Sequence, residues 1–291
     1  MTITAANAQK DLDLPTLMQA PLRLAHYVGK GHTSGEDISL EIYAAPPGSG
    51  IVFVLPHQGG LLALPATCDA VVNTLRNVVI GQGRTRLCIV EHFLCAAALW
   101  GLDDVLVHVD GMEMPLGDGS SLFWLQLFEA AGLPRKTPEA ADIELLSPIE
   151  VSKGDRAILI VPSEAFSASY LMDWDHPKIG KIWKTWDLSQ SIHEVADART
   201  FGSMAEQQMM GLDQAEGVVC LTQDGFSKPL RFEDEPVRHK LLDLIGDLIL
   251  CGVNPLRIKA RFISIKGGHE LDVMAAKKLK ETLALNSRQE K

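Results

Sequence analysis

Three polar side chains interrupt an otherwise apolar stretch, RHKLLDLIGDLILCG, at residues 238–252. His239, Asp243 and Asp247 are four residues apart, so on an α-helix they drift by only about 40° per step and point the same way. Two carboxylates and an imidazole are costly to bury unless something pairs with them. A His and an Asp at i and i+4 can bind one divalent metal ion, and zinc accepts such ligands. The alternative is a polar stripe that forms salt bridges with the neighbouring basic residues.

One helix face cannot complete a zinc site, so a further ligand must come from another part of the chain. The natural candidate is His92, which follows Glu91 in VEHFLCAAALWGL, residues 90–102. This stretch is Ala-rich and apolar on all sides, which predicts a buried helix. The alternative is that Glu91 is simply an acidic residue favoured at a helix N-terminus by the helix dipole.

Two further stretches carry groups that could take part in chemistry. His269 follows two glycines, on a turn between a predicted strand and the last predicted helix. Asp247 lies too far along its helix to share a metal easily, but a nearby carboxylate raises a histidine pKa and could keep His269 protonated. In ARTFG, Thr200 offers a hydroxyl and Phe201 an apolar wall. Taken alone, the first stretch is also typical of a surface histidine and the second of an ordinary turn.

The composition, with 46% hydrophobic and 22% charged residues, is that of a folded globular protein. A net charge of -10 argues against a general nucleic-acid or anionic-membrane binder. The five cysteines are an odd number without a CxxC pair, which is typical of reduced core residues in a cytoplasmic protein. The N-terminus has no signal-peptide pattern, and no apolar run reaches the ~20 residues of a spanning helix.

The pattern of predicted elements divides the chain into two halves. We expect a leader at residues 1–20, an α+β domain at 21–136, a polar linker at 137–144 and a second α+β domain at 145–291. Each half shows several strands, a buried helix, an alternating strand and a last helix, here predicted at 121–133 and 269–285. Each buried helix carries one group of polar residues. Packing the halves face to face would bring these groups together.

Together, these stretches resemble the zinc-dependent UDP-3-O-acyl-N-acetylglucosamine deacetylases of lipid A biosynthesis. The matching segments are VEHFLCAAALWGLDDVLVHVDGMEMPLGDGSS (90–121), ADARTFG (196–202), RFEDEPVRHKLLDLIGDL (231–248) and GGHELDVM (267–274). They occur in the family's order and at close to its spacing, and the resemblance covers roughly residues 22 to 285. It implies two similar domains, each with a β-sheet layer and packed helices, and with the helices sandwiched between the sheets.

The resemblance also implies a metal-dependent mechanism. By position, His92, His239 and Asp243 match the zinc ligands, although iron(II) suits the same set. Zinc polarises an amide carbonyl and lowers the pKa of its water toward ~7. Glu91 matches the general base, and His269, with Asp247 beside it, matches the general acid that protonates the leaving amine. Thr200 matches the hydroxyl that helps to hold the oxyanion.

Substrate recognition departs from the family more than the chemistry does. The resemblance implies that Lys240 contacts the substrate and that Phe201 lines its pocket. The family's GLHTG stretch is replaced by GKGHTSG (29–35), and its arginines are absent from IVFVLPHQGG (51–60). The segment that lines the family's acyl-chain passage is shortened to DQAEGVVCLTQDGFSKP (213–229).

These departures lead to one preferred prediction and two alternatives. The preferred function is a zinc-dependent deacetylase that removes an N-acetyl group from a divergent N-acylated substrate, for instance in secondary metabolism. The first alternative is the UDP-3-O-acyl-N-acetylglucosamine deacetylase of lipid A biosynthesis, which acts on a UDP-linked acylated sugar. The second is a catalytically silent binding homologue, although no proposed chemical residue is lost.

Overall fold

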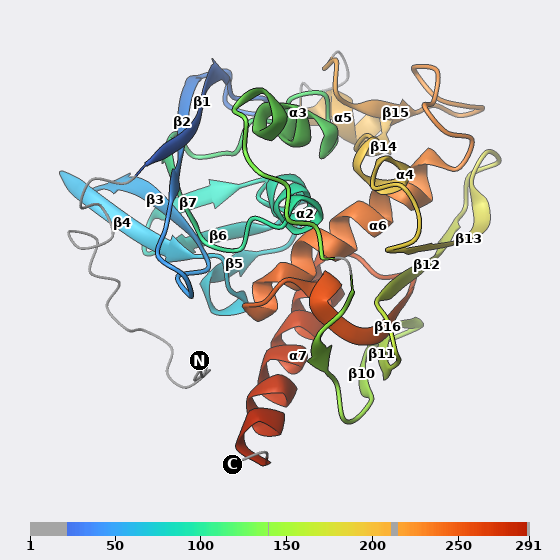
Figure 1. The fold of residues 1–291 in the computed structure, drawn as a ribbon. Helices are drawn as coiled ribbons and strands as arrows, with labels where there is room; N and C mark the ends of the chain where they lie inside the picture. Colours follow the sequence, from blue (N-terminus) through green and yellow to red (C-terminus); the bar gives the residue numbers. More distant parts are fainter. Residues whose placement is uncertain (1–21, 139, 211–214, 290–291) are drawn as a thin grey trace.

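The computed structural model describes residues 22–138, 140–210 and 215–289 (Figure 1). The leader expected at residues 1–20 therefore lies outside the described residues. The described chain combines several β-sheets with helices, which confirms the predicted α+β class. Within these ranges, no helix is both long enough and apolar enough to cross a membrane.

A five-stranded sheet forms the outer layer of the first half. It consists of β1 (Arg23–Lys30), β2 (Asp37–Ala44), β3 (Ile51–His57), β4 (Gly60–Pro65) and β8 (Val105–Asp110), in the order β1-β2-β8-β3-β4. β3 and β8 pair in parallel, and the other neighbours are antiparallel. Alternate residues of β2, Ile38, Leu40 and Ile42, are fully buried, as expected for a strand with one face on the core. A smaller antiparallel sheet follows, formed by β5 (Val71–Asn73), β6 (Val79–Gln82) and β7 (Thr85–Cys88).

The helices of the first half follow the predicted pattern. α2 (Glu91–Trp100) is buried on every side, and none of its residues is more than 8% exposed. It ends at Gly101, whose φ of +79° is the left-handed conformation that glycine adopts without a Cβ penalty. α3 (Leu122–Ala130) is the amphipathic helix expected at 121–133, and it is shorter at both ends. It buries Trp124, Leu125 and Phe128.

A second sheet forms the outer layer of the second half. Its strands are β9 (Ile143–Glu144), β10 (Ile149–Lys153), β11 (Arg156–Pro162), β12 (Ser167–Trp174), β13 (Gly180–Asp187) and β16 (Ile258–Ile265), in the order β10-β11-β16-β12-β13 with β9 beside β16. β9 thus occupies the last two residues of the expected linker. A short parallel pair, β14 (Phe201–Ser203) and β15 (Val219–Leu221), lies apart from this sheet.

The helices of the second half include the predicted buried helix and the predicted closing helix. They are α4 (His193–Ala196), α5 (Met204–Met210), α6 (Glu235–Leu248) and α7 (His269–Gln289), with 3-10 turns at η1 (Cys68–Ala70) in the first half and η2 (Ile249–Cys251) and η3 (Pro255–Arg257) in the second. α6 packs against α2, α7 and β12. It is therefore surrounded by other elements, which explains why residues 241–248 are all buried.

The two halves meet along α2 and α6, which lie between the sheets (Figure 1). Gly246 of α6 lies against the main chain of Glu91, and a Cβ added there would be 2.2 Å from the Glu91 carbonyl oxygen. Asn254 of the second half donates its side-chain amide to the Ala98 carbonyl of α2 at 3.0 Å. These contacts hold the first turn of α2 against the last turn of α6, and the last turn of α2 against the segment that follows α6.

Candidate metal centre

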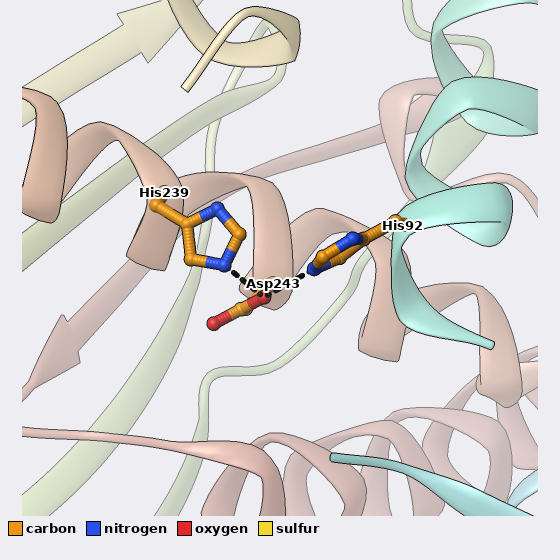
Figure 2. Close-up of side chains that lie close together, drawn as sticks. All are labelled: His92, His239 and Asp243. Carbon is orange, nitrogen blue, oxygen red and sulfur yellow. Dashed lines mark ion pairs between the residues drawn. The ribbon is translucent and has the colours of Figure 1, made fainter. Parts of the chain in front are cut away.

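Two histidines and an aspartate from different halves meet at the contact between α2 and α6 (Figure 2). His92 comes from the first turn of α2, and His239 and Asp243 come from successive turns of α6. Asp243 Oδ1 lies 3.4 Å from His239 Nε2 and 3.9 Å from His92 Nε2. The three side chains offer ligand atoms within 4.8 Å of one another, and each residue is at most 3% exposed. This arrangement could hold one metal ion.

The two imidazoles are held in the neutral form that a metal requires. Burial, together with the adjacent His239, lowers the pKa of His92 to about 3. Burial also lowers the pKa of His239. His239 Nδ1 lies 3.0 Å from the Ala198 carbonyl oxygen, which can only accept, so Nδ1 carries the hydrogen and Nε2 keeps its lone pair. The free lone pair therefore faces Asp243.

Asp243 stays ionised although it is buried. Burial raises its pKa, but the neighbouring His239 and Lys240 outweigh burial and hold the pKa well below the usual range. Lys240 Nζ donates to Asp243 Oδ2 at 2.6 Å and lies 5.5 Å from the centre of the Phe201 ring. Asp243 Oδ1 remains directed at the two imidazoles. The three residues together thus offer two neutral nitrogens and one anionic oxygen.

Glu91 lies next to this group and is 3% exposed. Its Oε2 accepts a hydrogen bond from the backbone N–H of Val78 at 3.1 Å. Burial raises the pKa of Glu91 to about 8; His269 acts against this rise and the charge of Asp247 adds to it. A carboxyl group that titrates near neutrality is suited to accepting and releasing a proton.

The backbone that leads into Glu91 is strained. Ile89 has a φ of +61°, a conformation that a β-branched residue rarely adopts. Its side chain is buried in a small apolar cluster with Leu116, Val218 and Cys220. Val218 and Cys220 belong to the segment around β15, so the second half packs directly against the entry to α2. Such strain persists only where the surroundings fix it.

A second buried group lies beside the first. His269, the first residue of α7, places Nδ1 2.8 Å from Asp247 Oδ2. Asp272 joins them, and the three ligand atoms lie within 4.8 Å of one another. The contact between His269 and Asp247 is the one expected from the sequence, whereas Asp272 was not anticipated. Its position three residues after His269 places both residues on the same helix face, but it gives no sign that Asp272 is buried.

Thr200 and Phe201 lie where the chain passes from α4 into β14. The backbone N–H of Thr200 donates to the Gly119 carbonyl at 2.7 Å, and its carbonyl accepts from Val219 at 2.9 Å. The Phe201 ring stands edge-on to His239 with ring centres 5.9 Å apart. Phe201 therefore forms part of the wall around the candidate metal ligands.

Beyond Phe201 lies a cavity of about 530 Å³. Trp174, which lines it, contacts the Phe201 ring with centres 5.1 Å apart. Met204 and Leu221 add apolar surface, and His176 and Thr222 add polar groups. A row of aromatic rings, His239, Phe201 and Trp174, thus leads from the candidate metal ligands to this cavity.

An ion pair fixes the loop that precedes Thr200. Glu235 is almost fully buried and accepts hydrogen bonds from the Nε and Nη2 atoms and the backbone N–H of Arg199, and from the backbone N–H of Arg231. Burial raises the pKa of Glu235, but these hydrogen bonds more than offset it and keep the pKa below its usual value. Sequence reasoning did not single out this pair, because an RFEDE stretch gives no sign of which acid is buried.

Comparison with known proteins gives a consistent family match. Residues 22–281 match the family model described as "UDP-3-O-acyl N-acetylglycosamine deacetylase", or LpxC. A UDP-3-O-acyl-N-acetylglucosamine deacetylase of a Nostoc species is 34% identical over 88% of this chain and 95% of its own length. Proteins of the same name from Thermosynechococcus vestitus and Leptospira biflexa are 35% and 33% identical, over 87% and 86% of this chain and 90% and 85% of their own lengths.

Proposed function

The chain belongs to the UDP-3-O-acyl-N-acetylglycosamine deacetylase family, and from this premise we propose that it is a zinc-dependent N-deacetylase. The observation that carries the proposal is the meeting of His92 with His239 and Asp243, which brings together two neutral imidazoles and one ionised carboxylate from separate halves. This donor set fits zinc, whose catalytic sites use three protein ligands and leave one position open. When bound, zinc supplies a Lewis acid that polarises the amide carbonyl and lowers the pKa of water.

The surrounding residues have the chemistry that amide hydrolysis needs. Glu91, which adjoins His92, takes the proton from the attacking water. The Thr200 hydroxyl donates to the oxygen that develops negative charge. His269, held by Asp247 at 2.8 Å, delivers a proton to the leaving amine, which departs poorly without one.

For the substrate, we infer the UDP-linked acylated sugar that gives the relatives their name. Lys240 offers a cation beside the ligand group, and Phe201 leads to the cavity of about 530 Å³. The apolar walls formed by Trp174, Met204 and Leu221 suit a hydrocarbon chain. A different N-acylated substrate, the function preferred from the sequence alone, stays a prediction that rests on the altered segments at 29–35, 51–60 and 213–229.

Acetate release from UDP-3-O-acyl-N-acetylglucosamine by the purified, metal-analysed protein tests this function. We expect turnover by the wild type and its loss in Glu91→Gln with metal content unchanged. Glu129→Gln, which alters an exposed carboxylate on α3, serves as the matched control. No acetate from a metal-loaded wild type would overturn the UDP-linked substrate. Acetate release from simpler N-acetyl sugars by the same preparation would then support the divergent substrate, and no release from any of them would support the silent homologue.

A further inference from the structure

Asp272 is a buried carboxylate for which the reaction described above has no role. It is fully inaccessible to solvent, and within the described residues neither of its oxygens has a hydrogen-bond partner. It lies on the first turn of α7, three residues after His269, so both side chains project from one face of the same helix. A buried polar atom without a partner is rare and costly, so a carboxylate kept in this position calls for an explanation.

The neighbours of Asp272 indicate where its charge acts. Asp247, from α6, and His269 offer atoms within 4.8 Å of each other and of an Asp272 oxygen. His269 therefore has two carboxylates beside it, one on each of two packed helices. Among the described residues, the other titratable or charged groups that face this space or flank it are Glu91 and His92 of α2, His239, Lys240 and Asp243 of α6, Tyr170 of β12, Arg156 of β11 and Lys153 of β10.

The two basic residues on β10 and β11 are engaged elsewhere. Arg156 and Lys153 both form ion pairs with Glu270, on the side of α7 that faces solvent. Lys240 pairs with Asp243 at 2.6 Å. The remaining partner for the two carboxylates is the His269 ring, which is itself 8% exposed. Opposite charges this close favour the charged form of each other in a buried setting.

We propose that Asp272 is a positioning residue for His269 and, with Asp247, keeps the imidazole in its protonated, proton-donating form. This inference rests on the proposed deacetylase function, in which His269 supplies the proton to the leaving amine. Asp247 binds Nδ1 and orients the ring, while Asp272 adds a second negative charge from the helix that carries the ring. Burial and the nearby Asp247 raise the pKa of Asp272 to about 7, and His269 opposes the rise. Burial also raises the pKa of Asp247.

The test follows the ring of His269 by NMR in the full-length protein, as pH is varied. The His269 signal is identified by its loss in His269→Gln. In Asp272→Asn, which keeps shape and removes the charge, we expect the imidazole pKa to fall by about one unit. The matched control is Glu270→Gln, which removes a carboxylate from the adjacent, solvent-facing position and should leave the titration unchanged.

Activity gives a second measurement on the same variants. The alkaline limb of the kcat/KM profile should move to lower pH in Asp272→Asn by about the same amount, because His269 would lose its proton at a lower pH than in the wild type. An unchanged His269 titration in a folded Asp272→Asn protein would overturn the inference, as would an equal shift in Glu270→Gln. A wild type without deacetylase activity would instead contradict the proposed function, while the NMR titration would still decide the role of Asp272.

Discussion

Gly246 and Glu91 are in contact through their main chains: a Cβ at Gly246 would lie 2.2 Å from the Glu91 carbonyl oxygen and 3.2 Å from the Cys95 nitrogen. The spacing of α2 and α6 therefore depends on the absence of a side chain at one position. Because α2 carries His92 and α6 carries the other two candidate ligands, this contact also sets the distance across the candidate metal centre.

Gly246→Ala should consequently weaken metal binding as well as the fold. Helix backbones cannot yield like a flexible side chain, so the helices must move apart; we expect a loss of about 1–3 kcal/mol in the free energy of unfolding. Metal affinity should fall at least tenfold. Urea unfolding and metal titration measure the two effects. In Gly225→Ala, where the new Cβ meets only Thr222 Oγ1 at 3.9 Å, both should stay at wild-type values. Wild-type metal affinity in Gly246→Ala would show that the contact does not position the ligands.

Removing a candidate ligand should abolish stoichiometric metal binding. For His92→Ala we expect metal affinity to fall by more than the roughly 10–100-fold that follows when a residue hydrogen-bonded to a metal ligand is removed. Elemental analysis after dialysis against a weak chelator is the measurement. His193→Ala provides the control, because this exposed histidine pairs with Asp197 and lies outside the ligand group. A full complement of metal in His92→Ala would exclude His92 as a ligand.

Replacing the proposed acid should separate proton donation from metal binding. His269→Gln keeps a polar side chain but cannot deliver a proton, so kcat should fall by about 10²–10⁴-fold. KM and metal content should change little, because the ligand group is formed by other residues. Steady-state kinetics and elemental analysis on the same sample give both values. If the metal were lost together with activity, His269 would have to be regarded as a ligand.

The buried Arg199–Glu235 pair predicts a pH dependence of stability. The pKa of Glu235 is lower in the folded state than in the unfolded chain. The ionised carboxylate therefore stabilises the fold fully at pH values above the pKa of the unfolded chain, and this stabilisation is lost as pH falls through the pKa of the folded state. At pH 7, Glu235→Gln should lose about 3–5 kcal/mol in the free energy of unfolding, since the Arg199 side chain, only 11% exposed, is left without its charged partner. The difference in the free energy of unfolding between wild type and Glu235→Gln should become smaller at acidic pH.

Urea unfolding of wild type and Glu235→Gln at a series of pH values between neutral and acid measures this dependence. Glu233→Gln, two residues earlier and exposed, is the control that should follow the wild-type curve throughout. A stability gap between wild type and Glu235→Gln that stays constant down to the lowest pH would mean that the ionisation of Glu235 does not stabilise the fold.

The two central helices and their polar residues could be predicted from the sequence because their signal is local. An apolar run such as 90–102 identifies a buried helix, and the spacing of His239 and Asp243 places both on one face. The meeting of His92 with that face could only be proposed from resemblance and from the expected packing of two similar halves. The structure brings the three side chains together.

Other features could not be predicted because they depend on contacts distant in sequence. The positive φ of Ile89 has no local sign in LCIVEH, and it persists because residues around β15 pack on its side chain. Asp272 resembles any acidic residue in the first turn of a helix, where it would be expected to face solvent. Its burial follows from the docking of α7 against α6, which no short stretch of sequence specifies.

The origin of the candidate ligands in two halves also fixes when the centre can form during folding. His92 and His239 are far apart in the chain, and the ordering of so long a loop must precede any contact between them. A nascent chain that has emerged only as far as α3 carries one ligand and no site. Under the proposed function, metal uptake is therefore a late event, which follows the docking of the two halves and does not nucleate either one.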